Sequence, residues 1–150
     1  LRLKRVPVLA SFLIAVAHLV SMMLGFFLVS SARMLSDFPQ SLALLVIVAF
    51  TLAVNVKDLK DRVGDHKEGV YTLPVLFGEV TGRYLVGGML FLSYLCVPFF
   101  FPFRFFFSVM FVVGLVAWWA VVKGKSERFL FVLHCSAIFA LVVIWMAFIK

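Results

Sequence analysis

Five long apolar segments, separated by polar connections, restrict what this chain can fold into. The segments cover residues 6–31, 39–56, 83–101, 105–122 and 129–149. A helix needs about 20 mostly apolar residues to cross a bilayer, and each segment is close to that length. None of them alternates apolar with polar residues, as the strands of a membrane barrel do. The sequence therefore predicts an all-α membrane protein with five transmembrane helices.

The composition supports this fold class and argues against a soluble domain. Hydrophobic residues make up 65% of the 150 residues and charged residues only 14%, against about 25% charged residues in a typical soluble domain. A chain this short keeps too much surface to hide that apolar content from water. Membrane lipid is the expected surrounding. The net charge of +7 does not indicate nucleic-acid binding, because basic and aromatic residues do not interleave outside the apolar segments.

Lysine and arginine residues are distributed unevenly between the two ends of the predicted helices. If the N-terminus is cytoplasmic, all fourteen lie on the cytoplasmic side except Arg33, Arg104 and Lys150. Positively charged connections stay preferentially on that side of a membrane. The prediction is an integral, multi-pass membrane protein in which residues 57–82 form a cytoplasmic, aspartate-rich loop. No repeat or linker divides the chain, so residues 1–150 are expected to form a single transmembrane domain.

Five residues predict where helices begin and end near this loop. Asp37 is the expected N-cap of the second helix. That helix is expected to continue past residue 56 and to be loosened or ended by Gly64 and Gly69. Thr72 is then the expected cap of a new helix, with Pro74 in its first turn.

Acidic residues are concentrated in this loop. Asp58, Asp61, Asp65 and Glu68 are four of the seven acids in the chain, and they lie within eleven residues. Asn55 and the three aspartates are separated by three, three and four positions, which places them on one face of a helix. Like charges on one face repel each other, and the repulsion grows at a membrane margin, where the effective dielectric is lower.

A divalent cation offsets this repulsion, and carboxylate oxygens are the ligands that Mg²⁺ and Ca²⁺ prefer. The alternative is a solvated loop whose acids are balanced by its cations. Lys57, Lys60 and Arg62 are expected to point away from the acidic face. Lys60, Arg62 and Lys67 either help to hold a phosphate or simply mark the cytoplasmic side.

A few polar or aromatic residues interrupt the apolar segments. His18 and His134 lie mid-helix, where a histidine is a candidate functional group, but a hydrogen bond to a neighbouring helix is the favoured interpretation. Trp118 and Trp119 lie near one end of their segment. They are expected in the aromatic belt at the membrane surface.

Residues 61–78, DRVGDHKEGVYTLPVLFG, closely resemble the second aspartate-rich motif of the UbiA superfamily of intramembrane prenyltransferases. That motif is DxxxD, followed by a glycine, a Thr-Leu-Pro turn and a further glycine. Asp58 resembles the first residue of the extended DxxD form seen in many members. Residues 3–7, LKRVP, are similar to the basic loop that lies near the middle of the family's chains.

The resemblance implies a fold of nine transmembrane helices around a central cavity, of which the five segments correspond to helices five to nine. It also implies Mg²⁺-dependent transfer of a prenyl group from an isoprenyl diphosphate to a lipophilic acceptor, aromatic or similar. The family's first aspartate-rich motif is not present, because no other two aspartates lie close together. The chain is therefore expected to be the C-terminal part of a longer prenyltransferase. Only half of the diphosphate site is expected here, and the missing N-terminal half would supply the rest.

Carried over by position, Asp61 and Asp65 are the expected catalytic residues and principal Mg²⁺ ligands, and Asp58 is a third ligand. Lys67 and Asn55 are the expected diphosphate contacts. One alternative is a non-catalytic multi-span membrane protein, such as part of a transporter or a degenerate remnant. Another is a CDP-alcohol phosphatidyltransferase, but the DG and AR steps of that family's longer acidic motif are missing from this sequence.

Overall fold

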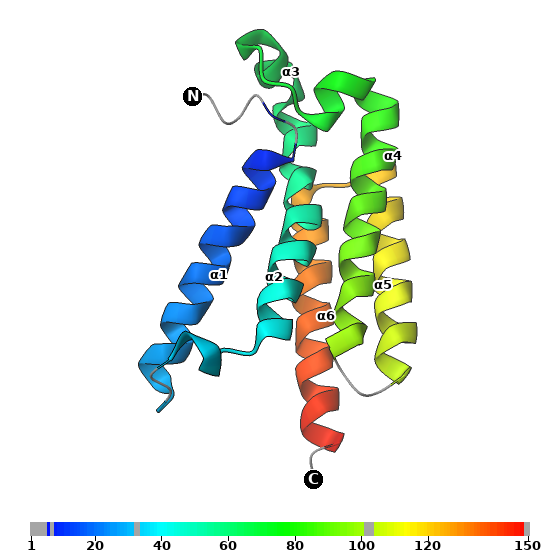
Figure 1. Cartoon of the computed structure of the whole chain (residues 1–150). Coiled ribbons are helices and arrows are strands. Elements are labelled where there is room, and N and C mark those ends of the chain that lie inside the picture. The colour runs from blue at the N-terminus through cyan, green and yellow to red at the C-terminus, as the bar shows by residue number, and fades with distance from the viewer. Residues whose placement is uncertain (1–5, 7, 32–33, 101–103, 149–150) are drawn as a thin grey trace.

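The computed structural model describes residues 6, 8–31, 34–100 and 104–148. Every element within these ranges is helical, and the six α-helices form five long helices along the chain, because α2 and α3 are continuous (Figure 1). The elements are α1 (Leu9–Val29), η2 (Leu35–Asp37), α2 (Gln40–Ala53), η3 (Val54–Lys57), α3 (Asp58–Glu68), α4 (Leu73–Cys96), η4 (Val97–Phe100), α5 (Arg104–Val122) and α6 (Glu127–Phe148). The short 3₁₀ turn η3 joins α2 to α3, so these three form one continuous helix.

Four of the five helices are long and apolar enough to cross a membrane. They are Leu9–Val29, Gln40–Glu68, Leu73–Phe99 and Phe105–Val122. The remaining helix, α6, covers the fifth apolar segment. The predicted all-α membrane fold is therefore confirmed. Helices satisfy the hydrogen bonds of their own backbone, which lipid cannot do for them.

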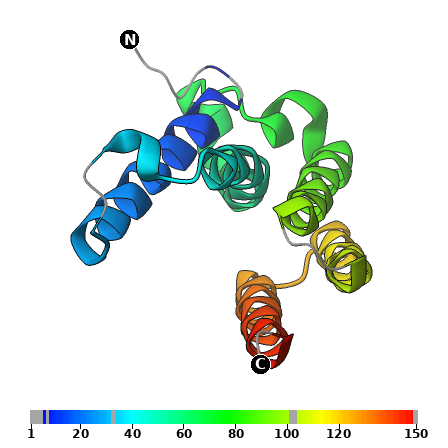
Figure 2. The same cartoon turned by 60° about the horizontal axis from the view of Figure 1, so that its bottom comes forward.

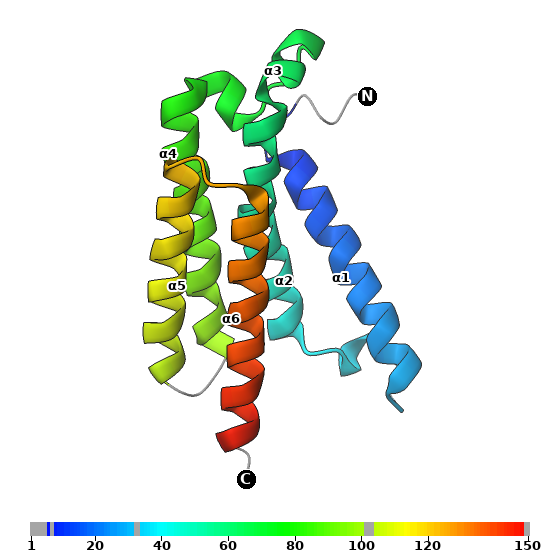
Figure 3. The same cartoon turned by 180° about the vertical axis from the view of Figure 1, so that it is seen from behind.

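The helices stand roughly side by side, with α1 leaning away from the others at one end (Figure 1). Viewed towards the ends of the helices, α1, α2, α4, α5 and α6 follow an open arc (Figure 2). The opposite view shows α6 beside α5, with α3 projecting at the end where α5 connects to α6 (Figure 3). The acidic helix thus lies beyond the apolar part of the molecule.

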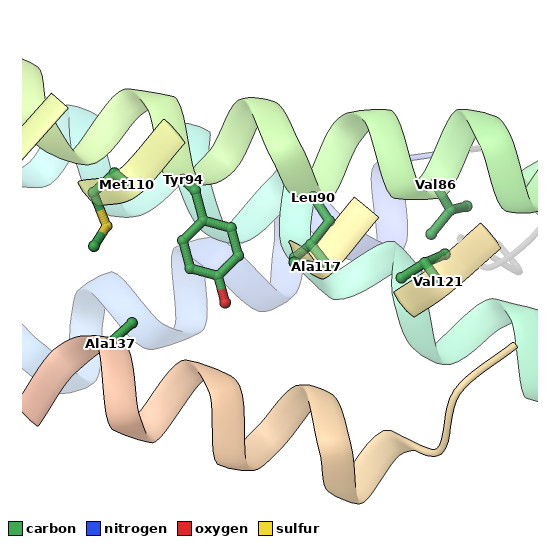
Figure 4. Packing of buried hydrophobic residues seen from close by; sticks show 7 residues of the cluster. All are labelled: Val86, Leu90, Tyr94, Met110, Ala117, Val121 and Ala137. Carbon is green, nitrogen blue, oxygen red and sulfur yellow. The ribbon is translucent and has the colours of Figure 1, made fainter. Parts of the chain in front are cut away.

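The buried core lies mainly between α4 and α5 and is completed by α6 (Figure 4). It contains Val86, Leu90, Tyr94, Met110, Ala117, Val121 and Ala137. The Tyr94 hydroxyl points towards α6, where it forms a hydrogen bond of 3.2 Å with His134 Nδ1. The predicted interhelical hydrogen bond of His134 is therefore confirmed.

The corresponding prediction for His18 is wrong. Its Nδ1 lies 2.9 Å from the Ile14 carbonyl oxygen of its own helix. The contact with the neighbouring helix is made by the ring, whose centroid lies 4.8 Å from that of Phe50. A backbone carbonyl one turn away is the nearest acceptor for this polar group.

Two predicted helix boundaries are also wrong. Pro39, not Asp37, is the N-cap of α2. Asp37 lies in η2, where its Oδ2 accepts a hydrogen bond of 3.0 Å from the Met34 backbone N–H. The third apolar segment was expected to begin a helix at residue 83. It instead continues the helix predicted to start after Thr72, and the two form one bent helix, α4, from Leu73. Residues 57–82 are therefore mostly helical, and only 69–72 form a loop.

Some predictions fall on residues that the structure does not describe. Residues 3–5 and 7 of the predicted basic loop, together with Arg33 and Lys150, lie outside the described ranges. The side chain of Arg104 is also outside them.

A sharp bend in α4 explains why its first turn and its apolar part were predicted as separate helices. Gly78 has φ 78° and ψ 176°, which interrupts the helix after its first five residues. This backbone conformation is open to glycine and strained for other residues. The first turn folds onto the later part of α4, where buried Pro74 packs against Gly82. A Cβ on Gly82 would lie only 2.8 Å from the Pro74 Cα.

We predict that Gly82→Ala destabilises the protein. The added methyl group must displace the Pro74 backbone, and overpacking of this kind costs about 1–3 kcal/mol, more than the gain in helix propensity of about 1 kcal/mol. Gly88→Ala in the same helix is the matched control, because nothing lies within 4 Å of its added Cβ. Thermal unfolding in detergent should show a lower Tm for Gly82→Ala than for Gly88→Ala. Equal or reversed Tm values would contradict the packing of Pro74 on Gly82.

Candidate functional site: an aspartate-lined pocket

A small pocket of about 80 Å³ lies between the start of α1, helix α3 and the loop before α4. Asp58, Asp61 and Asp65 all line it. Its other lining residues are Val6, Val8, Ala10, Ser11, Lys57, Val70, Tyr71 and Thr72. The prediction that the three aspartates share one helix face is therefore confirmed. Their positions follow from the spacing of three and four residues within a regular α-helix.

The end of α3 fixes the far wall of the pocket. Gly69 has φ 66° and donates its N–H to the His66 carbonyl oxygen at 3.3 Å. The N–H of Val70 donates to the Asp65 carbonyl oxygen at 2.8 Å. This pair of bonds is a Schellman motif, which ends a helix and reverses the chain. It brings Tyr71 and Thr72 back towards the aspartates. Gly64 does not end the helix, because α3 continues through it.

A buried hydrogen bond ties the base of the pocket to α1. Ser11 Oγ donates to Asn55 Oδ1 at 3.0 Å, and the two residues are only 2% and 1% exposed. The Asn55 amide nitrogen donates to the carbonyl oxygens of Thr51 and Leu52 at 2.6 and 3.3 Å. Asn55 lies in η3, one turn before Asp58, and is not among the residues that line the pocket. Its contact with a diphosphate stays a prediction.

The lysines and arginine of this region divide between the pocket and its surroundings. Lys57 lines the pocket, so the expectation that it points away from the acidic face is wrong. Lys60 Nζ lies 3.6 Å from Glu127 Oε2, and Arg62 NH2 lies 3.2 Å from Glu79 Oε2. Both are therefore engaged outside the pocket.

Lys67 is exposed and is not among the lining residues. The expected contact of Lys67 with a diphosphate stays a prediction.

Burial and neighbouring charges both act on the carboxyl group of Asp58 in this pocket. It follows the apolar part of its helix, at the first residue of α3. Burial raises the pKa of Asp58 to about 6, the charge of Lys57 opposes this rise, and the Asp65 and Asp61 carboxylates add to it. Burial and like charges both favour the neutral carboxyl group. A bound cation would favour the ionised form, which is the form that coordinates metals.

Thr72 contributes a further polar atom to the pocket wall. It is the N-cap residue of α4, as predicted, and Pro74 lies in the first turn. Its hydroxyl makes no cap hydrogen bond, however, and Oγ1 is buried without a hydrogen-bond partner among the described residues. Buried hydroxyl groups are usually satisfied. Thr72 therefore carries a buried, unsatisfied hydroxyl next to the pocket.

The pocket fits Mg²⁺ only as part of a larger ligand set. Within the described part of the chain, no three His, Cys, Asp or Glu side chains are close enough to hold a metal ion among themselves. Mg²⁺ commonly takes one or two protein carboxylates and fills its other positions with water and substrate phosphate. Asp58, Asp61 and Asp65 suit that role, because they offer hard oxygen ligands in one pocket.

Sequence reasoning missed Ser11 and Lys57 as parts of the site. Ser11 lies 44 positions before its partner Asn55. It is one of several serines in the first apolar segment, so nothing in the pattern marked it. Lys57 adjoins the first aspartate, and its place in the wall depends on how the α1 start and the loop before α4 close around it.

These features define an integral membrane protein, built of apolar helices, with an aspartate-lined pocket beyond their apolar part. Residues 1–129 match the model of the UbiA prenyltransferase family. The match covers most of the chain and includes the whole pocket, so the chain belongs to this family. The match favours this family over the CDP-alcohol phosphatidyltransferases. Neither a curated protein nor a solved structure matches the chain.

We predict that Ser11 and Asn55 stabilise the protein together. Ser11→Ala removes the donor and Asn55→Ala the acceptor, so each single change leaves a buried partner without its bond. A double-mutant cycle on unfolding in detergent should give a coupling free energy of about 0.5–1.5 kcal/mol. Ser21→Ala is the control, because that exposed hydroxyl bonds only the Ala17 carbonyl oxygen of its own helix. Simple additivity of the two changes would exclude the interhelical bond.

Proposed function

We propose that this chain forms one wall of the diphosphate site of a membrane-embedded prenyltransferase. The reaction transfers a prenyl group from an isoprenyl diphosphate to a lipophilic acceptor, aromatic or similar. The observation that carries the proposal is the placement of Asp58, Asp61 and Asp65 around one pocket, in a chain that belongs to the UbiA prenyltransferase family. The proposal also places this end of the molecule on the cytoplasmic side, as the distribution of lysine and arginine indicates.

In the proposed reaction, the bond between the allylic carbon and the diphosphate oxygen breaks, and the electron pair leaves with the diphosphate. The nucleophilic atom of the acceptor forms the new bond to the allylic carbon and loses a proton. Mg²⁺ would stabilise the charge that develops on the leaving diphosphate. Asp61 and Asp65 would hold the ion, with Asp58 as a third ligand. Lys57 and Thr72, which line the pocket, would contact phosphate oxygens.

The site is proposed to be completed by a second aspartate-rich segment from a missing N-terminal half. The three carboxylates do not form a metal site by themselves, and a pocket of about 80 Å³ is smaller than the ~300 Å³ or more of a typical ligand site. Both observations suit a half-site that closes around its substrate with another segment.

We predict that Asp61→Asn and Asp65→Asn each abolish prenyl transfer. The change keeps the shape of the side chain but removes the charge that binds the cation, so the rate of diphosphate release should fall by roughly 10²-fold or more. The assay uses the product of the full open reading frame with geranylgeranyl diphosphate or a similar diphosphate, with and without Mg²⁺. Glu68→Gln is the matched control, because Glu68 is exposed on the same helix and does not line the pocket.

Turnover in both aspartate variants at the wild-type rate would rule out this assignment. Failure of the wild-type protein to release diphosphate from any substrate in the panel would favour a non-catalytic family member instead.

The two lysines near the aspartates give a second test. Lys57 lines the pocket, whereas Lys67 does not. Lys57→Gln should therefore raise the KM for the diphosphate several-fold, with a smaller effect of Lys67→Gln. Steady-state kinetics at fixed Mg²⁺ measure both. A larger effect at Lys67 would show that the diphosphate lies outside the pocket wall described here.

A further inference from the structure

A second polar pocket lies at the same end of the molecule but on the other side of the α2–α3 helix. Its volume is about 410 Å³, and it is bounded by the start of α3, by α4 and by the connection between α5 and α6. Four cationic residues line it, Lys60, Arg83, Lys125 and Arg128, against the single carboxylate of Glu127. Its lining shares no residue with the aspartate pocket. An inference about it therefore does not depend on the proposed function.

Arg83 is held in place at the wall of this pocket. Its NH2 group donates to Glu79 Oε1 at 3.1 Å, and its NH1 group donates to the Val121 carbonyl oxygen at 3.4 Å. The turn after α5 is shaped around the guanidinium group, because a Cβ on Gly124 would lie 2.7 Å from NH1. Gly124 has φ 64°. The guanidinium group of Arg83 therefore has a defined position at the pocket wall.

The other cations retain most of their capacity to bind an anion. Lys60 and Glu127 form an ion pair of 3.6 Å, but their side chains are 72% and 59% exposed, and such pairs contribute little. The ammonium group of Lys125 lies 5.5 Å from the centroid of the Trp119 ring. Tryptophan near the end of a membrane helix favours the level of the lipid headgroups. The pocket thus carries excess positive charge where lipid phosphates are found.

An apolar cavity adjoins this pocket on its membrane side. Val56 and Leu130 line both spaces. The cavity has a volume of about 490 Å³ and is lined chiefly by apolar side chains of α2, α4 and α6. Its polar lining residues are already engaged: Ser93 Oγ donates to the Leu90 carbonyl oxygen at 2.7 Å, and Tyr94 pairs with His134. Such a surface accepts hydrocarbon at no cost in unsatisfied polar groups.

We propose that an anionic phospholipid binds across these two spaces. Its phosphate lies among Lys60, Arg83, Lys125 and Arg128, and one acyl chain enters the cavity between α2, α4 and α6. Basic pockets between membrane helices are known sites for acidic headgroups. The adjoining apolar cavity favours a lipid over a soluble phosphate, because a soluble ion would leave it unfilled.

The test is native mass spectrometry of the detergent-solubilised full chain with dioleoyl phosphatidylglycerol or dioleoyl phosphatidylcholine. The wild-type protein should retain phosphatidylglycerol in preference to phosphatidylcholine. Lys125→Gln with Arg128→Gln should lower that affinity on the order of tenfold, since each charge near anionic lipid contributes about a severalfold factor. Lys123→Gln, an exposed cation that does not line the pocket, should leave it unchanged. Ala49→Phe, which fills the cavity from α2, should also reduce retention.

Three outcomes of the retention measurements would overturn the proposal. They are equal retention of the two lipids by the wild type, wild-type retention by the double variant, and equal losses in the double variant and in Lys123→Gln. Competition experiments then show which kind of phosphate-bearing molecule the pocket binds. Displacement of the lipid by millimolar inorganic phosphate or diphosphate would assign the pocket to a soluble anion. Displacement by micromolar geranylgeranyl diphosphate would assign it to the prenyl substrate. Either result would show that the ligand of this pocket is not a phospholipid, and would overturn the proposal.

Discussion

Lipid offers no hydrogen bonds, and this constraint governs how the chain is organised. Backbone groups inside a bilayer must pair within their own helix, and charged side chains are expensive there. Accordingly, the chain consists of long helices of almost purely apolar sequence, and most of the charged residues that the structure describes lie at one end of them. Polar groups further inside are few, and some of them pair between helices, as Tyr94 and His134 show. Chemistry is therefore possible mainly at that end, where both polar pockets lie.

Two sets of contacts hold the aspartate helix at this end. On one side, the buried Ser11–Asn55 hydrogen bond joins α1 to the turn that precedes α3. On the other, Glu79 lies between Arg62 and Arg83 and links α3 to α4 just after the bend. The second set is partly exposed and contributes modestly to stability. These ion pairs set the orientation of α3 relative to α4 more than they add to the free energy of unfolding. Together the contacts place α3 between the two pockets, with its aspartates on one side and Lys60 on the other.

The sequence was sufficient for the features that depend on composition and period. The apolar segments gave the helices, and the spacing of Asp58, Asp61 and Asp65 gave their common face. What it could not give depends on contacts between distant residues or on local backbone choices. Asp37 was a plausible cap, but it closes a 3₁₀ turn instead. The helix start at Thr72 was predicted, but its continuity with the apolar segment was not, because the bend at Gly78 separates the first turn of α4 from that segment. The hydrogen bond of Ser11 to Asn55 depends on how α1 packs against α2, which the sequence does not show.

The connection between α3 and α4 spans only residues 69–72, and both of its ends are fixed by backbone hydrogen bonds. A link this short leaves the aspartates little freedom to rearrange relative to α4. Most of the entropy needed to align them is then lost when the chain folds, not when a ligand arrives. For a small, highly charged ligand, such rigidity increases affinity without any added contact. A substitution at Gly69 or Gly78, outside the carboxylates themselves, would then act on the proposed binding through the order of the unbound state.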